Sequence, residues 1–138
     1  MPLIEGTTGV KTLVAEYDFA VDGGTVGSKT LRGIAGNGNS IPAGSTVIGG
    51  YLEVLTAFTS ASTNTGTVAL TLEGAGDLVV GTSQPVSGAP LSTTGRKDIL
   101  PDSTGDTSIR TTTARSVVAT LAIAAITAGK LRVHLRYV

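Results

Sequence analysis

The chain has 138 residues, of which 14% are charged, and its ten basic and ten acidic side chains give a formal net charge of zero. This balance argues against nucleic acid or an anionic membrane as a partner, because both attract proteins through an excess of positive charge. No cysteine is present, which excludes disulfides and thiolate metal sites, and no stretch predicts a signal peptide or a transmembrane helix.

The composition favours strands over helices. Nineteen glycines, two Phe, three Tyr and no Trp, in a background rich in Thr, Ser, Val and Ala, suit short strands joined by tight turns. In chain order, residues 1–11 show no periodicity and are expected to form an extended N-terminal arm. Residues 12–138 are expected to form a single domain, because this length is sufficient for one buried core.

Alternating apolar and polar residues predict strands at 12–21, 25–31 and 46–58. Asp-Gly-Gly at 22–24 predicts a hairpin turn between the first two strands, because tight hairpins need the positive φ that glycine supplies. The glycine pair at 49–50 interrupts the third strand and indicates a β-bulge or a close backbone approach.

Shorter alternations predict strands at 67–73 and 78–80, with briefer pairing at 97–100 and a polar strand at 108–113. About eight short strands and no convincing helix predict an all-β fold. The expected architecture is a single-domain antiparallel β-sandwich or a jelly-roll-like barrel.

The C-terminal stretch carries the clearest pattern, two strands joined by a turn at Thr-Ala-Gly 127–129. The first, at 117–126, is apolar on both faces and is expected to be a central strand covered on both sides. The second alternates strictly. Its apolar side is Leu131, Val133, Leu135 and Tyr137, and its polar side is Lys130, Arg132, His134 and Arg136.

The polar stripe Lys130, Arg132, His134 and Arg136 is the candidate partner-contact face, since it could meet an acidic patch on another protein. The alternative is cross-strand pairing of these residues with acids on neighbouring strands. The acids considered are Glu16, Asp18 and Glu53. That alternative is favoured, because exposed ion pairs are the commoner fate of such residues. His134 is interpreted as a surface histidine.

No set of residues predicts catalysis, a cofactor or a metal site. Gly-Ser-Lys-Thr at 27–30 differs from a phosphate-binding loop, because a serine separates glycine from lysine and a strand follows instead of a helix. A calcium loop at 98–106 is conceivable, but its aspartate spacing matches no known calcium loop. We therefore expect a protein that is not an enzyme, with no cofactor and no metal.

The order of several phrases along the chain carries a resemblance. The phrases are Glu-Tyr-Asp-Phe-Ala-Val-Asp-Gly-Gly at 16–24, Ile-Pro-Ala-Gly at 41–44, Ser-Gly-Ala-Pro at 87–90, Ser-Thr-Thr-Gly-Arg-Lys at 92–97, Thr-Thr-Thr-Ala-Arg at 111–115 and Leu-Ala-Ile-Ala-Ala-Ile-Thr-Ala-Gly-Lys at 121–130. Together they resemble small virion proteins of tailed bacteriophages, of the head decoration or capsid cement kind. The phrases are turns and strand starts, so no catalytic residues carry over.

The resemblance implies a place on the outer surface of the phage head, assembled in the host cytoplasm. It implies the major capsid protein as partner, and self-association as a homotrimer. Two alternatives remain open: a tail or fibre component that contacts the host, and a carbohydrate-binding β-sandwich module. The last needs exposed aromatic rings, whereas Tyr17, Tyr51 and Tyr137 all lie in predicted strands.

Overall fold

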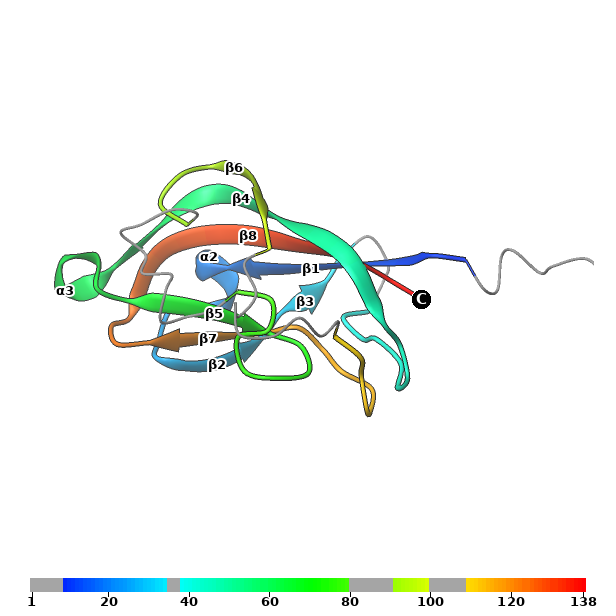
Figure 1. Ribbon diagram of the computed structural model, residues 1–138. Helices are drawn as coiled ribbons and strands as arrows, with labels where there is room; N and C mark the ends of the chain where they lie inside the picture. The colour runs from blue at the N-terminus through cyan, green and yellow to red at the C-terminus, as the bar shows by residue number, and fades with distance from the viewer. Residues whose placement is uncertain (1–8, 35–37, 80–90, 100–108) are drawn as a thin grey trace, which may run out of the picture.

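The computed structural model describes residues 9–34, 38–79, 91–99 and 109–138. In chain order the elements are β1 (Lys11–Asp18), α2 (Phe19–Asp22), β2 (Gly27–Thr30), β3 (Arg32–Gly33), β4 (Val47–Ser60), α3 (Ala61–Asn64), β5 (Thr67–Thr71), β6 (Gly95–Asp98), β7 (Val118–Ala122) and β8 (Ile126–Tyr137). The strands form two antiparallel sheets in two layers (Figure 1). Their orders are β3-β1-β8-β4-β6 and β2-β7-β5, so the predicted all-β sandwich is confirmed.

β8 is the central strand of the five-stranded sheet. It pairs along most of its length with β1 on one side and β4 on the other. The predicted alternation is confirmed, because its four apolar side chains are buried. They are Leu131, Val133, Leu135 and Tyr137. Full burial of an apolar side chain of this size contributes about 1.5–3 kcal/mol before entropy is subtracted, so β8 anchors the core.

The core lies between the two sheets and draws on both. Its members from four other strands include Leu13, Ala15 and Tyr17 of β1, Leu52, Val54 and Phe58 of β4, Val68 and Leu70 of β5, and Ala119 and Leu121 of β7. The rings of Tyr17 and Phe58 stack with centroids 5.8 Å apart. The described elements therefore share one continuous core.

The hairpin predicted at residues 22–24 is wrong. β1 ends at Asp18, whose carboxylate accepts a 3.0 Å hydrogen bond from the Ala20 amide and caps the helical turn α2. Asp22 accepts a second bond from the Asp18 amide. These local bonds turn the chain out of its first sheet. β1 therefore pairs with β3 and β8, whereas β2 pairs with β7 in the other sheet.

The turn predicted at residues 127–129 is also wrong, because these residues belong to β8. The chain turns earlier, around Ile123, whose φ is 71°. The strands β7 and β8 lie in different sheets and are not hydrogen-bonded neighbours. Gly129 serves packing: a Cβ there would lie 2.6 Å from the ring of Phe58. Glycine thus lets the aromatic ring lie against the β8 backbone.

The prediction of a central strand at 117–126 is confirmed in part. β7 is the middle strand of its sheet, between β2 and β5. Only one of its faces is buried, by Ala119 and Leu121, while Val118 and Thr120 are half-buried on the outer face. Coverage on both sides is therefore wrong for this strand.

The remaining strand predictions have mixed outcomes. The long strand is β4, and its register against β8 shifts between Val47 and Gly49, which agrees with the bulge or close backbone approach predicted at the glycine pair. The segment at 97–100 appears as β6, paired with β4. The segment at 78–80 contributes a single bridge between Leu70 and Val79. The described part of 108–113 holds only an isolated bridge and no strand.

Most of the predicted arm, residues 1–8, lies outside the described residues. β1 begins at Lys11, one residue before the predicted start of the domain. None of the helices that the structure describes has the length and apolar character needed to cross a membrane.

Candidate functional site: two outer surfaces of the sandwich

The polar stripe of β8 lies on the outer face of the five-stranded sheet. Strand register places Arg132 opposite Glu16 of β1 and Glu53 of β4. Glu16 in turn faces Arg32 of β3, and Glu53 faces Arg96 of β6. One row of side chains, Arg32, Glu16, Arg132, Glu53 and Arg96, therefore crosses all five strands with alternating sign. We call these five residues the charge row.

Direct contacts hold the charge row on both sides of Glu16 and between Glu53 and Arg96. The Arg132 Nε lies 2.9 Å from a Glu16 carboxylate oxygen, and an Arg32 Nη lies 3.4 Å from the other. Arg96 Nε lies 3.7 Å from Glu53. The Glu16 side chain is only 9% exposed. A carboxylate this well covered depends on its cationic partners, because burying an unpaired charge is costly.

Lys130 and Arg136, the residues at the two ends of the stripe, differ in their ion pairing. Lys130 Nζ lies 3.9 Å from Glu16 and 3.8 Å from Asp18, so it extends the paired network. Arg136 is exposed and makes no ion pair with any described residue. The cross-strand alternative thus describes Lys130 and Arg132. The partner-contact face stays a prediction. Arg136 is the residue of this face whose charge makes no ion pair with the described residues and could pair with a partner.

His134, predicted to be a surface histidine, lies on the outer face of the five-stranded sheet and is half-buried there, with 22% of its side chain exposed. Its ring stacks on Tyr51 at 4.4 Å, and the Arg96 guanidinium lies over the same tyrosine. Nε2 is buried, 3.9 Å from Glu53, with no hydrogen-bond partner among the described residues. Burial lowers the pKa of His134, Arg132 and Arg96 add to the lowering, and Glu53 opposes it. The neutral imidazole is therefore favoured.

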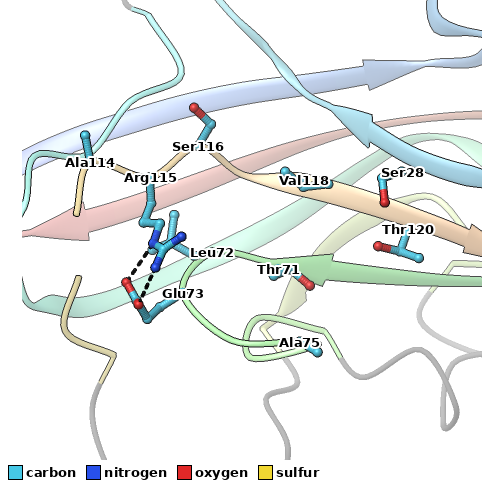
Figure 2. A pocket seen from close by; sticks show the side chains of 10 residues that line it. All are labelled: Ser28, Thr71, Leu72, Glu73, Ala75, Ala114, Arg115, Ser116, Val118 and Thr120. Carbon is cyan, nitrogen blue, oxygen red and sulfur yellow. Dashed lines mark hydrogen bonds and ion pairs between the residues drawn. The ribbon is translucent and has the colours of Figure 1, made fainter. Parts of the chain in front are cut away.

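A shallow cavity of about 450 Å³ lies on the outer side of the three-stranded sheet (Figure 2). Its lining combines hydroxyl groups with small apolar side chains. The lining residues are Ser28, Thr71, Leu72, Glu73, Ala75, Ala114, Arg115, Ser116, Val118 and Thr120. Ser28, Thr71 and Thr120 come from the three neighbouring strands β2, β5 and β7 (Figure 2).

A charge pair closes one end of this cavity. Arg115 donates from Nε and Nη2 to the two Glu73 carboxylate oxygens, at 2.9 and 2.8 Å (Figure 2). The Thr112 amide and hydroxyl donate to the same oxygens. The hydrogen bonds from Arg115 and Thr112 lower the pKa of Glu73 to about 2. The pair joins two segments distant in sequence and leaves the cavity without net charge.

The other sequence candidates do not form a site. Residues 27–30 form the strand β2 and not the start of a helix. Lys29 Nζ donates a 3.1 Å hydrogen bond to the Thr25 hydroxyl. Within the described ranges, no three His, Asp or Glu side chains gather as a metal ion would require. The conceivable calcium loop at 98–106 lies mostly outside the described residues.

The sequence indicated that the stripe pairs across strands with Glu16, Asp18 or Glu53, but it did not indicate a row across five strands or the Glu73–Arg115 pair. Glu16 and Arg132 are 116 residues apart, and Glu73 and Arg115 are 42 apart, so no local pattern brings them together. The available signal was the position of Glu16 and Glu53 on the polar sides of predicted strands. Predicting which of these side chains lie opposite one another requires the strand order and register, which local alternation does not specify.

No protein-family model matches the chain, and no curated protein matches it. Two solved structures contain similar chains. One belongs to the cyanophage Pam1 capsid asymmetric unit, with a TM-score of 0.60 and 20% identity over 94% of this chain and 84% of that chain. The other belongs to the acidic stable capsid structure of Helicobacter pylori bacteriophage KHP30, with a TM-score of 0.60 and 16% identity over 94% and 87%. At these identities the likeness establishes a shared fold: the β-sandwich described above also occurs in chains of two phage capsids.

Proposed function

We propose that the chain is a virion structural protein of a bacteriophage, a decoration or cement protein that binds the outer surface of the major capsid lattice and stabilises the head. The observation that carries this proposal is the fold it shares with chains of two phage capsid structures, over 94% of its own length. The match also spans 84% and 87% of those chains, so the likeness concerns nearly whole chains and not a common fragment.

The chemistry of the surface agrees with adhesion. The charge row pairs its two glutamates with arginines, so that three arginines and two glutamates leave a net charge of only +1, and the cavity carries no net charge. A protein that repeats over a lattice gains from many weak contacts at once, so each copy needs only a modest interface. We propose self-association as a homotrimer and no enzymatic activity, with the major capsid protein as the partner beneath.

The predicted contact face gives a test of how the chain meets this partner. Arg136 is exposed and makes no ion pair with any described residue, whereas Arg132 is paired with Glu16. If the stripe meets an acidic patch, the substitution Arg136→Glu weakens binding to particles. A matched variant, Lys97→Glu on the edge strand β6, should leave binding unchanged. Equal binding of both variants and the unmodified chain would remove the stripe as the contact.

The proposed function itself is tested on phage particles. The gene is deleted, and the resulting heads are compared with normal heads by protein mass spectrometry and by the temperature at which they release DNA. We expect the chain in purified normal heads at high copy number, and earlier DNA release from heads that lack it. Purified chain added back should restore the release temperature. Absence from purified heads would refute the proposal.

The alternatives receive less support from the side chains. Sugar-binding modules stack sugars on exposed aromatic rings, but Tyr17 and Tyr137 are buried here. Tyr51 is covered by His134 and Arg96. A tail or fibre location remains distinguishable by the same particle analysis, because isolated tails would then contain the chain and isolated heads would not.

A further inference from the structure

One end of the sandwich carries no charged side chain. It is formed by α3 and by residues 122–125 between β7 and β8, which we call the uncharged tip. The Ala61 amide donates a 2.9 Å hydrogen bond to the Ala125 carbonyl, so the two turns lie side by side (Figure 1). The segments that contain them, residues 59–72 and 116–129, include no Asp, Glu, Lys, Arg or His.

Backbone strain gathers at this tip. Among the described residues, four residues other than glycine have positive φ: Ser62 at 56°, Thr63 at 60°, Asn64 at 60° and Ile123 at 71°. All four belong to the uncharged tip. L-residues avoid this region, β-branched residues most of all, and consecutive left-handed residues are rare. Such strain persists where the surrounding structure enforces it, and it is typical of functional positions.

Ile123 is the most informative member of the tip. Its side chain is 75% exposed, more than any other large apolar side chain that the structure describes. The strained backbone therefore presents an apolar group to solvent, where it contributes nothing to the core. A glycine or asparagine would fit the same backbone more easily. Contact with a partner would explain why an exposed isoleucine occupies this strained backbone position.

The same half of the molecule offers a receptor for such a group. The cavity on the three-stranded sheet has apolar side chains, including Leu72 and Val118, and its one charge pair, Glu73 and Arg115, is self-neutralised. The β7 strand lines the cavity with Val118 and Thr120 and then leads away to the tip. Tip and cavity are thus different surfaces of one molecule, both without net charge.

We propose that the uncharged tip of one copy, led by Ile123, inserts into the cavity on the three-stranded sheet of the next copy. Each copy then offers a tip and receives one in its cavity, and when this contact repeats head-to-tail it closes into a ring if the rotation between copies permits. This inference rests on the self-association proposed above and names the two surfaces that would make it. The uncharged surfaces meet without leaving a buried unpaired charge.

Cysteine cross-linking tests the pairing directly, because the chain contains no native cysteine. Chains with Ile123→Cys are mixed with chains carrying Thr120→Cys, oxidised mildly, and analysed without reductant. The control mixture pairs Ile123→Cys with Ile48→Cys, an exposed position of β4 near the far end of β8. We expect mixed disulfides about tenfold faster in the first mixture, because association raises the effective concentration.

Equal rates in the two mixtures would overturn the proposal, as would Ile123→Cys chains that cross-link mainly with themselves. A second measurement avoids new disulfides: Ile123→Asn should shift sedimentation towards the monomer without lowering the melting temperature. Val10→Asn, at an exposed apolar position before β1, should change neither. A chain found in phage heads but lacking the preferential cross-link would overturn this inference alone.

Discussion

The two outer surfaces of the sandwich differ in how their side chains are satisfied. On the five-stranded sheet, the charge row places Glu16 between Arg32 and Arg132, and Lys130 and Asp18 extend the pairing. On the other sheet, β5 and β7 contain no charged residue and expose hydroxyl and small apolar groups. A dense array of charges is therefore no sign of an interface in itself, because most of these charges already have partners within the chain.

The largest loss of stability is expected from a substitution in the core that lies between the two sheets. Gly129→Ala places a Cβ 2.6 Å from the ring of Phe58, which packs in the core between the sheets. Overpacking and the φ of 149° should together lower the free energy of unfolding by about 3 kcal/mol. Gly74→Ala is the matched control, since nothing lies within 4 Å of the added Cβ. Urea denaturation of both variants measures the difference, and equal stabilities would contradict the packing role of Gly129.

The next largest loss of stability is expected from removing Glu16, the acid that contacts three cations. Glu16→Ala leaves Arg32, Lys130 and Arg132 without their shared carboxylate. Because these cations are partly exposed, water can solvate them in part, and we expect a loss of about 2 kcal/mol. Arg136→Gln removes a charge without an ion pair among the described residues and should change stability by less than about 0.5 kcal/mol. Equal losses would mean that the row contributes nothing specific.

A substitution at the uncharged tip should act in the opposite direction. Thr63→Gly relieves a β-branched residue at φ 60°, and we expect a gain of about 1 kcal/mol. Thr67→Gly, in the strand β5, should instead lower stability, because glycine weakens a strand. Thermal unfolding of the pair measures the contrast. A loss in Thr63→Gly would show that the tip is not strained.

The smallest effect concerns His134 and pH. Burial lowers its pKa below the usual value of 6.5. Between the two pKa values the unfolded chain binds more protons, so the free energy of unfolding should fall as the pH drops below 6.5. His134→Gln should flatten this part of the pH dependence. Denaturation midpoints measured across this range test it, and an unchanged slope would contradict the assigned burial.

Sequence patterns predicted what depends on local alternation and missed what depends on distant strands. The burial of Leu131 and Val133 follows from a period of two, and it was predicted correctly. Gly129 gave a turn signal, yet it is a glycine because Phe58 packs against it from another strand. Likewise Arg132 was expected to pair with an acid on a neighbouring strand, but the choice among Glu16, Asp18 and Glu53 became visible only once the register of β1 against β8 was known.

High-resolution cryo-EM of intact phage particles tests the central claim most directly. We predict density for this β-sandwich on the outer surface of the capsid lattice, with the uncharged tip of one copy in the cavity on the three-stranded sheet of the next. Density for the chain only in the tail, or a sandwich on the lattice whose tip and cavity both face solvent, would contradict this prediction.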